Sequence, residues 1–341
     1  MKISIIVCTR DRCTRLKALL SSLADAHGAG PMDLDLIVVD DGSRDATAVA
    51  VKQFASIAEF PVRLLQQPGR GLAAARNRGL REAYGDLLIF LDDDCLVSRT
   101  YFRDVVARFE ADDEPVLRVG RVELGDPLDA PVTIKTTPDV ERLGARGDPG
   151  GFILGCNMTM THAVACKVGL FDERFGAGGL LRSAEDTDYM LRALLAGITV
   201  EYVPDMTVYH HHGRRSLEAV SGVHRNYGIG NGALAMKHAR RAPWLWRSRY
   251  WTLRNAVRET FGGPPFDPQV GLPHAPIVVH NLIGAYLFVL AKIRRAAPWP
   301  EPADLEWMRA PASVEVRQKR TLTRLRNPDA REAASTGDFA P

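Results

Sequence analysis

Several short motifs that mark nucleotide-binding and metal-binding proteins are missing from these 341 residues. No G-x-G-x-x-G follows a predicted strand and no G-x-x-x-x-G-K-S/T occurs, which excludes the dinucleotide-binding Rossmann fingerprint and the P-loop. The five cysteines include no C-x-x-C pair, so the sequence offers neither a zinc motif of that spacing nor a thioredoxin-like redox motif. Reduced thiols in a cytoplasmic protein are therefore expected.

Long apolar runs and a strong net charge are also absent. The apolar stretch 277–291 is interrupted by His280 and Asn281 and falls short of the roughly 20 residues that span a bilayer, so a buried or interfacial helix is expected. The chain enters a strand directly at Ile3, without the apolar region and cleavage site of a signal peptide. The formal net charge is only +3, but acidic clusters lie before residue 190 and basic ones after residue 213.

Strand-like and helix-like segments alternate through the first hundred residues. The predicted strands are residues 3–7, 34–39, 61–66 and 87–91, and the predicted helices are residues 15–26, 45–58 and 71–84. This alternation predicts an α/β fold with a Rossmann-like, mostly parallel sheet that is covered by helices on both faces. In such folds the ligand cleft lies at the carboxyl ends of the strands.

Three consecutive carboxylates, Asp92, Asp93 and Asp94, follow the last of these strands. Two like charges about 4 Å apart repel by roughly 1 kcal/mol in water and by about 4 kcal/mol at an effective dielectric constant of 20, so three of them need compensation. A divalent cation supplies it, and an Asp-x-Asp pattern of oxygen ligands suits Mg²⁺ or Mn²⁺ completed by substrate phosphate oxygens. The alternative is an acidic turn that caps the next helix.

Polar residues also follow the first two strands. They are CTRDR at residues 8–12 and DDGS at residues 40–43. Each cluster alone is explained by helix capping or turn formation, but the carboxyl ends of parallel strands meet in one crevice. Thr9, Asp41 and Asp94 are then expected to hold the backbone side, the base edge and the metal-diphosphate side of a nucleotide.

Five ordered motifs resemble those of the inverting, metal-dependent nucleotide-sugar glycosyltransferases of family 2, which have the GT-A fold. The motifs are SIIVCTRDR at 4–12, VVDDGS at 38–43, GLAAARNRG at 71–79, FLDDD at 90–94 and AEDTD at 184–188, and the resemblance covers roughly residues 1–215. It implies that Asp41 reads the nucleobase, that Asp92 and Asp94 are the outer positions of the metal motif, and that Arg76 lies near the nucleotide. The chain departs from the family at Arg10, where many relatives begin a Tyr-Asn pair.

A second group of carboxylates opens a predicted helix at residues 184–196. Acids in a first turn gain about 0.3–1 kcal/mol from the helix dipole, so a structural role is the alternative. Transfer of a sugar to a hydroxyl needs a base that takes the acceptor proton, and Asp186 resembles the family's base. Glu185 is then a candidate for orienting the acceptor and Asp188 for supporting the helix end. Asn157, in a preceding strand, is expected either to contact the acceptor or to lie in a turn.

Residues 210–212 are three consecutive histidines at the end of another predicted strand. A bare run lacks the spacing of a zinc motif, and a surface turn is its ordinary explanation. The family resemblance implies a histidine here near the metal and diphosphate, with His210 preferred to His212. The predicted ligands of Mn²⁺ or Mg²⁺ are thus Asp94, Asp92, His210 and His212, and the predicted nucleotide-binding residues are Thr9, Arg10, Asp41, Arg76, Asp92 and Asp93.

The chain changes in character near residue 215. Residues 213–258 hold ten Lys or Arg and one acid, interleaved with Trp244, Trp246, Tyr250 and Trp251. We expect three parts: a GT-A domain at 1–215, a basic, aromatic helical extension at 216–300, and a polar, disordered tail at 301–341. Because no nucleic-acid-binding module is recognised, the extension is expected to contact the inner face of a membrane, with an oligomer interface or a polysaccharide-binding face as open alternatives.

The predicted function is transfer of one sugar from a nucleoside-diphosphate sugar, a UDP-sugar first, to a hydroxyl of a glycan or lipid-linked acceptor. Such a cytoplasmic or peripheral membrane enzyme suits cell-envelope polysaccharide biosynthesis. A haloacid-dehalogenase-type phosphatase is the first alternative, because an Asp-x-Asp pair after a strand also fits it, although Cys95 stands where that motif continues with Thr. The second is a nucleotide- or carbohydrate-binding module without catalysis.

Overall fold

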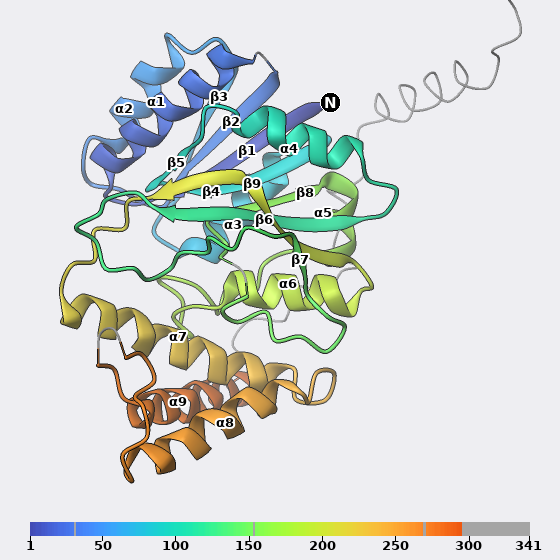
Figure 1. Ribbon diagram of the computed structural model, residues 1–341. Coiled ribbons are helices and arrows are strands. Elements are labelled where there is room, and N and C mark those ends of the chain that lie inside the picture. The colour runs from blue at the N-terminus through green and yellow to red at the C-terminus, as the bar shows by residue number, and fades with distance from the viewer. Residues whose placement is uncertain (31, 153, 269–270, 295–341) are drawn as a thin grey trace, which may run out of the picture. The chain divides into compact units, whose positions relative to one another are not determined.

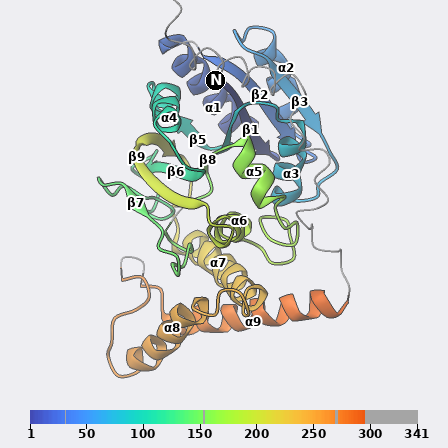
Figure 2. The same cartoon turned by 90° about the vertical axis from the view of Figure 1, so that its right-hand side faces the viewer.

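The computed structural model describes residues 1–30, 32–152, 154–268 and 271–294 (Figure 1). These residues belong to one compact unit, Met1–Asp304. The described strands form one sheet in the order β3-β2-β1-β4-β8-β6-β9-β5, with β7 paired to β9. Helices cover both faces of this sheet and three more follow it, so the predicted α/β fold with a helical extension is confirmed (Figure 2). The predicted tail, 301–341, lies outside the described residues.

The N-terminal half forms as the alternation of segments predicts. Its elements are β1 (Lys2–Thr9), α1 (Cys13–Ala29), β2 (Asp33–Asp40), α2 (Thr47–Ala55), β3 (Val62–Gln66), α3 (Leu72–Glu82) and β4 (Leu87–Asp92). Strand β1 pairs in parallel with β2 and β4, and β2 pairs in parallel with β3. Each predicted strand and helix in this half is confirmed to within three residues at either end.

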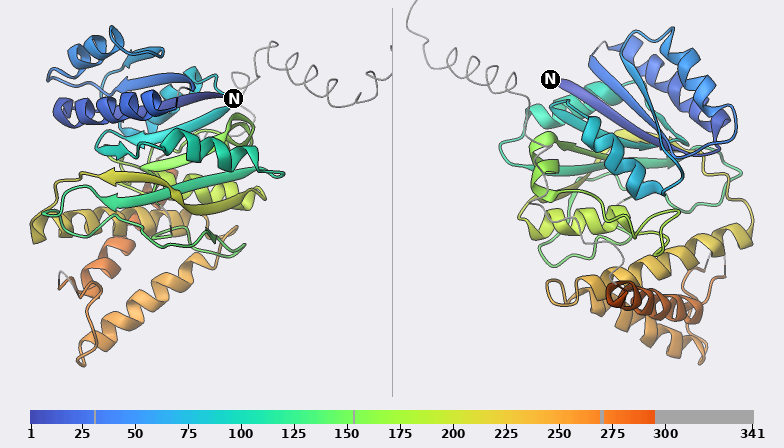
Figure 3. Two further views of the ribbon diagram at one scale, coloured as in Figure 1. Left: turned by 45° about the horizontal axis from the view of Figure 1, so that its top comes forward. Right: turned by 180° about the vertical axis from the view of Figure 1, so that it is seen from behind.

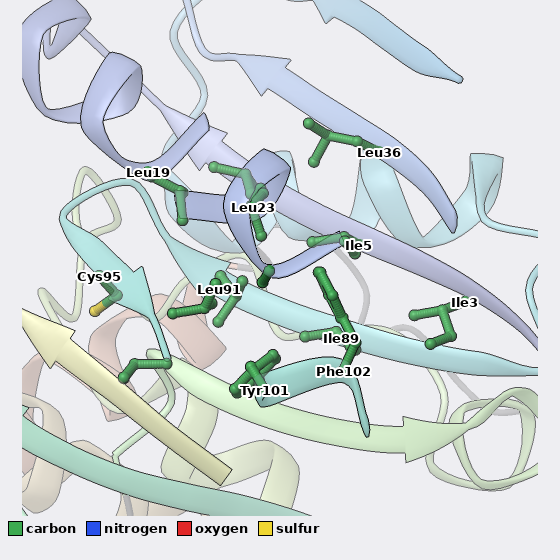
Figure 4. Close-up of a cluster of buried hydrophobic side chains, with 14 of the residues drawn as sticks. Ile3, Ile5, Leu19, Leu23, Leu36, Ile89, Leu91, Cys95, Tyr101 and Phe102 are labelled. Carbon is green, nitrogen blue, oxygen red and sulfur yellow. The ribbon is translucent and has the colours of Figure 1, made fainter. Parts of the chain in front are cut away.

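The central strands are buried on both faces, which explains their unbroken apolar sequences. Ile5 of β1 points into the cluster that packs under α1, beside Leu19, Leu23 and Ile89 (Figure 4). The next side chain along β1, Ile6, faces α3, where an added Cβ on Gly79 would lie 2.5 Å from its Cγ2. The glycine therefore lets α3 lie close against the sheet, and the buried strands form a rigid platform for the polar residues at their ends.

The second half of the sheet is mixed. Its elements are β5 (Cys95–Val97), α4 (Tyr101–Glu110), β6 (Val116–Leu124), β7 (Glu141–Arg142), β8 (Asn157–Thr161), α5 (His162–Val168), α6 (Glu185–Leu195) and β9 (Thr199–His210). Strand β8 runs antiparallel between β4 and β6, while β6 and β9 are parallel. Because β8 is antiparallel, its first residue, Asn157, pairs with Leu91 at the end of β4. The residues that precede β8 therefore reach the edge where the parallel strands end.

Among the described residues, the extension has three helices: α7 (Leu217–Lys237), α8 (Leu245–Glu259) and α9 (His274–Ile293). Helix α7 packs on α6, and α8 and α9 lie on the side of α7 that faces away from the sheet (Figure 3). Helices α7 and α9 cross closely at small residues, since an added Cβ on Gly284 would lie 1.8 Å from the Ile229 carbonyl oxygen. Helix α9 is longer than the predicted 277–291, and by length and composition it is the one described helix that could cross a membrane. The predicted domain boundary near residue 215 stays a prediction.

The close crossing of α7 and α9 makes a stability prediction. We expect Gly284→Ala to lower the free energy of unfolding by about 1–3 kcal/mol, because the new methyl group pushes the two helices apart. The matched control is Gly222→Ala in α7, where no atom lies within 4 Å of the added Cβ. Alanine is favoured over glycine in a helix by about 1 kcal/mol, so this control should keep or gain stability. Urea denaturation compares the two, and equal stability of Gly284→Ala and wild type would contradict the prediction.

Candidate active site

A cleft of about 450 Å³ lies at the carboxyl ends of β1, β2 and β4. The parallel register explains why polar residues gather there, because Cys8 lies opposite Asp92 and Thr9 lies opposite Asp40. All but two of the predicted site residues line this cleft. They are Thr9, Arg10, Asp41, Arg76, Asp92, Asp93, Asp94, Glu185, Asp186 and His210.

Arginine side chains of α1 and the preceding turn neutralise the buried carboxylates after β4. One guanidinium nitrogen of Arg12 lies 2.9 Å from Asp93 Oδ1 and 3.0 Å from Asp94 Oδ2, and Arg15 lies 3.4 Å from Asp94 Oδ2. The Thr9 hydroxyl donates to Asp93 Oδ2 at 2.7 Å. Burial nevertheless raises the pKa of Asp93 to about 6. Neither arginine was among the predicted site residues, although Arg12 ends the CTRDR cluster and three adjacent carboxylates need compensation.

His210, at the end of β9, pairs with the third carboxylate. Its Nε2 lies 3.4 Å from Asp94 Oδ1, and both side chains are buried. Burial alone would lower the pKa of His210, but the hydrogen bond and charge of Asp94 outweigh it and raise that pKa to about 9. Burial would likewise raise the pKa of Asp94, but His210 and Arg12 lower it to about 2. The two groups therefore form an ion pair at neutral pH.

Arg76 of α3 joins the two groups of carboxylates. Its guanidinium donates to Asp92 Oδ1 and to Glu185 Oε1, each at 3.0 Å, and is itself buried. Burial, helped by the neighbouring Asp186, raises the pKa of Glu185 to about 7 despite this arginine. Glu185, at the start of α6, therefore lines the cleft from a buried position beside Arg76.

Asp186 is the more accessible acid of α6. Its Oδ2 accepts the Gly155 N–H at 2.9 Å, and its Oδ1 accepts the Thr187 N–H at 2.6 Å. An added Cβ on Gly155 would lie 2.4 Å from Asp186 Oδ2, so only glycine leaves room for the carboxylate in this position. Ala184, which precedes the helix, has a left-handed backbone with φ of 70°. The carboxylate is therefore held in one orientation on the rim of the cleft.

Asp41, after β2, is surrounded by N–H donors. Its Oδ1 accepts from Gln67 Nε2 at 2.7 Å and from the Arg70 N–H at 2.9 Å, and its Oδ2 accepts from the Gly71 N–H at 2.8 Å. Gly71 has φ of 97°, and an added Cβ there would lie 3.1 Å from the Ala177 carbonyl oxygen. A glycine is thus required at the point where the loop before α3 closes on the carboxylate.

Two predicted site residues lie outside the cleft, and the structure contradicts the roles expected for them. Asn157 is fully buried in the sheet, where it accepts from the Tyr101 hydroxyl at 2.6 Å and donates to the Met206 carbonyl at 2.7 Å. It holds strands together, so the predicted acceptor contact is wrong. His212 accepts the Arg214 N–H at 3.0 Å on Nδ1, while its Nε2 lies 3.1 Å from the Ala130 carbonyl. Both ring nitrogens are used, so the predicted metal contact is wrong as well.

Residues that the sequence analysis did not single out complete the walls. Thr133 lies 3.3 Å from His210 Nδ1, and Arg214 donates to the Thr133 hydroxyl at 3.2 Å. Three of the four described non-glycine residues with positive φ line the cleft, namely Thr133, Arg182 and Ala184. Such backbone conformations cost about 1–3 kcal/mol each and gather at functional sites. Asn226 and Tyr227 of α7 form a further wall, so the helical extension takes part in the cleft.

Two groups of side chains around His210 offer metal ligands. Asp92, Asp94 and His210 line the cleft with oxygen and nitrogen atoms, a donor set that suits Mn²⁺ or Mg²⁺. In the second group, ligand atoms of Cys95, Cys156 and His210 lie within 4.8 Å of one another. Burial raises the pKa of the Cys95 thiol well above its ordinary value, which opposes the thiolate that a soft metal needs. None of the five cysteines, which all lie in the described residues, forms a disulfide, as predicted.

The pairing of Asp94 with His210 predicts a pH dependence. Because the pKa of His210 is raised by folding, the pair stabilises the protein fully below pH 6.5 and this stabilisation is lost as the pH rises through about 9. In Asp94→Asn the burial remains and the hydrogen-bonded charge is gone, so the pKa of His210 should fall and the loss of stability as the pH rises toward 9 should become smaller. NMR titration of the imidazole measures the pKa of His210, and urea unfolding at about pH 6.5 and about pH 9 measures the change in stability.

The matched control for that experiment is Asp93→Asn. It makes the same change one residue away, and Asp93 has no contact with His210. The pKa of His210 should therefore stay raised in this variant. A raised pKa of His210 in Asp94→Asn would show that another group carries the interaction.

Comparison with known proteins agrees with this geometry. The family model described as "Glycosyl transferase family 2" matches residues 4–166. Pre-mycofactocin glycosyltransferase of Mycobacterium tuberculosis is 28% identical over 241 residues, which are 69% of this chain and 48% of that protein. Poly(ribitol-phosphate) beta-N-acetylglucosaminyltransferase TarS of Staphylococcus aureus is 26% identical over 211 residues, 62% of this chain and 35% of that protein. The chain thus spans less than half the length of either relative.

Solved structures share the fold. Residues 1–349 of S. aureus TarS in complex with UDP-GlcNAc align with a TM-score of 0.51 and 16% identity, covering 88% of this chain and 93% of that one. The mannosyltransferase PcManGT of Pyrobaculum calidifontis, in complex with GDP-Man and Mn²⁺, aligns with a TM-score of 0.50 and 18% identity, covering 95% and 83%. Together with the polar edge formed by β1, β2 and β4, these matches show that the chain has the GT-A fold and that its residues 4–166 match glycosyltransferase family 2.

Proposed function

We propose that this chain is a metal-dependent, inverting glycosyltransferase that moves one sugar from a nucleoside-diphosphate sugar to a hydroxyl group. The observation that carries the proposal is that one cleft gathers Asp41, the pair formed by Asp94 and His210, and the accessible Asp186. These groups meet the three needs of the reaction, which are binding of the base, neutralisation of the diphosphate and removal of the acceptor proton. The relatives named above are glycosyltransferases and support the same class.

Asp41 would bind the nucleobase. A carboxylate has about four acceptor positions, and three of those on Asp41 are taken by N–H groups, so one remains for an N–H of a base. Uracil carries such a group, and similar structures were solved with UDP-GlcNAc or with GDP-Man. We infer a UDP-sugar as the first donor to test. Arg10 and Thr9 line the same cleft.

Asp94, with Asp92 and His210, would hold Mn²⁺ or Mg²⁺. A bound cation would neutralise the diphosphate and stabilise the charge that grows on the leaving group. Arg12 and Arg15 stay within reach of Asp94, so the chain itself supplies further positive charge beside the diphosphate. Because His210 must be neutral to bind a metal, binding would release a proton near neutral pH.

Asp186 would act as the base. Its carboxylate is partly exposed on the rim and would take the proton of the acceptor hydroxyl as that oxygen bonds to the anomeric carbon and the nucleoside diphosphate leaves. Attack from the side opposite the leaving group inverts the anomeric configuration. Glu185 is buried against Arg76, so we propose that it positions this arginine and the helix start instead of touching the acceptor.

The geometry argues against the phosphatase alternative. In that mechanism the second Asp of the Asp-x-Asp pair donates a proton, but Asp94 is paired with His210 and its pKa is lowered to about 2. It is therefore ionised at neutral pH and has no proton to give. A module without catalysis is disfavoured because the proposed base and the carboxylates for a metal all line the cleft.

The acceptor and the location remain part of the proposal. We infer a hydroxyl of a glycan or a lipid-linked acceptor in cell-envelope polysaccharide synthesis, and a cytoplasmic position on or near the inner face of the membrane. A panel of nucleoside diphosphates, each with and without Mn²⁺, tests the donor through the rise in melting temperature that binding produces. UDP with Mn²⁺ should give the largest rise, and no response to any nucleotide would contradict the proposed function.

The metal assignment predicts the behaviour of Asp94→Asn. This variant should stay folded and lose the Mn²⁺-dependent part of UDP binding, because a ligand that bridges protein and cation is gone. Isothermal titration calorimetry with UDP, with and without Mn²⁺, measures the loss. Asp113→Asn, an exposed carboxylate away from the cleft, is the matched control and should bind as the wild type does. If Asp94→Asn keeps the Mn²⁺-dependent affinity for UDP, the assignment of Asp94 as a metal ligand is wrong.

The base assignment predicts a separation of binding from chemistry. Asp186→Asn keeps the shape of the side chain and cannot take a proton, so turnover should fall by about 10²–10⁴ while UDP affinity stays nearly unchanged. Release of UDP from a UDP-sugar, with water or an acceptor as nucleophile, measures turnover. Glu185→Gln makes the matching change next to it and should cost less, since Glu185 faces Arg76. Near-normal turnover of Asp186→Asn, or a product that retains the donor's anomeric configuration, would refute the role.

A further inference from the structure

Helix α8 presents two adjacent stripes of different character to solvent. One stripe is apolar and aromatic and recurs at spacings of four and three residues: Trp246, Tyr250, Leu253 and Val257. Each residue of the second stripe directly follows a residue of the first. This stripe consists of three arginines and a tryptophan: Arg247, Trp251, Arg254 and Arg258. These eight side chains are all exposed. An isolated exposed apolar residue is ordinary, but a continuous stripe beside arginines indicates a contact surface.

Helix α9 adds a second apolar stripe. Its exposed side chains are Val279, Leu282, Ile283, Tyr286, Val289 and Ile293, with 38–70% of each accessible. Its opposite face, with Ile277, Gly284 and Phe288, is buried in the extension. The helix is therefore two-sided, and a helix surrounded by lipid has no such buried half. Lys292 and Arg294 follow at its C-terminal end and are also exposed.

Two residues that the sequence analysis counted with this surface serve the fold instead. Trp244 donates from Nε1 to the Gly147 carbonyl at 3.2 Å. Arg249 lies 2.6 Å from an oxygen of Asp148. Both tie α8 to the loop that follows β7. The surface is thus restricted to the exposed stripes of α8 and α9, which we call the α8–α9 face.

The α8–α9 face lies one helix away from the cleft. Helix α7 lines the cleft with Val223, Asn226 and Tyr227, and its glycines contact α9 near His280 and Asn281. The figures show α8 and α9 together on the side of α7 that is remote from α1 and α2 (Figures 1 and 2). A surface held against the α8–α9 face would therefore be near the side of the cleft that α7 forms.

We propose that the α8–α9 face docks on an anionic lipid bilayer, so that the cleft works on an acceptor held at that bilayer. Tryptophan and tyrosine prefer the headgroup layer, and arginines beside them attract anionic lipids. Within α8 and α9 the one acid is Glu259, which is bound to His274, so the face offers a nearly unopposed positive charge. The docking step stands without the proposed transferase activity, but the statement about the acceptor rests on it.

A second copy of the chain is a poorer occupant of this face. A two-fold dimer brings the same patch of both subunits together, so the arginines of one stripe would meet those of the other. Like charges placed opposite each other in an interface are unfavourable. An anionic membrane instead complements both the apolar stripe and the cationic stripe at once.

Vesicle flotation tests the docking. The wild type should float with vesicles that contain phosphatidylglycerol mixed into phosphatidylcholine, float far less with phosphatidylcholine alone, and be released by high salt. In Arg247→Glu/Arg254→Glu/Arg258→Glu each lost arginine costs about fivefold in partitioning, so the fall should exceed a hundredfold. In Tyr250→Ser/Leu253→Ser/Val257→Ser, binding to the anionic vesicles should fall at low and at high salt concentration, because the apolar part of the contact is lost.

The matched control reverses three exposed cations on other helices, in Lys17→Glu/Lys52→Glu/Arg103→Glu. It changes the net charge by the same amount at α1, α2 and α4, and its flotation should stay close to that of the wild type. Failure of the wild type to float with either vesicle, or equal losses in the arginine variant and the control, would overturn the proposal. A wild type that sediments as a dimer, and becomes a monomer when the apolar stripe is replaced, would also overturn it.

UDP binding without vesicles is measured in parallel for each variant. It should not change, because none of the altered residues lines the cleft. Flotation without any nucleotide binding would refute the proposed function and leave the docking intact. Nucleotide binding without flotation would refute the docking and leave the proposed function intact.

Discussion

Buried negative charge at the carboxyl edge of the sheet is the constraint on which the rest of this structure depends. Asp93 and Asp94 are each only 3% exposed, and they follow a strand that is buried on both faces. Such charges persist only when cations lie beside them. Arg12 comes from the turn before α1 and His210 from the end of β9, almost 200 residues later. The same compensation that allows the carboxylates to be buried therefore closes the N-terminal half of the sheet onto the mixed half.

A second chain of charges connects the cleft to the helical extension. Arg76 joins Asp92 to Glu185 at the start of α6. Further along α6, Asp188 is bound by Lys237 of α7, which also lies 3.0 Å from Asp172. Burial lowers the pKa of Lys237 to about 8 even between these acids. The helix that carries the proposed base is thus tied on one side to the proposed metal-binding edge and on the other to α7.

These ion pairs connect the helical extension to the cleft in which the proposed reaction takes place. Helix α7 forms one wall of the cleft and is the layer on which α9 packs. Helix α6, which carries the proposed base, and helix α9 of the proposed membrane surface therefore both pack on α7. A surface that holds the extension would orient the cleft without any change in the sheet. The tertiary structure, rather than any single motif, makes the two proposals compatible.

The sequence alone determined the first half of the fold and most of the cleft. Short apolar runs that alternate with helix-like segments of period 3.6 located β1 to β4 and α1 to α3, and polar residues after buried strands marked Thr9, Asp41 and Asp94 because parallel strands end at one edge. Only the tertiary structure decided which polar and charged side chains pair with one another and are therefore not available to a ligand. The polar atoms of Asn157 and His212 are of the predicted type, but they form hydrogen bonds with Tyr101, with the Met206 carbonyl and with other main-chain groups. Arg12, in contrast, contacts carboxylates that lie 81 and 82 positions away in the sequence. Such partnerships depend on distances in space, which neither periodicity nor motif spacing contains.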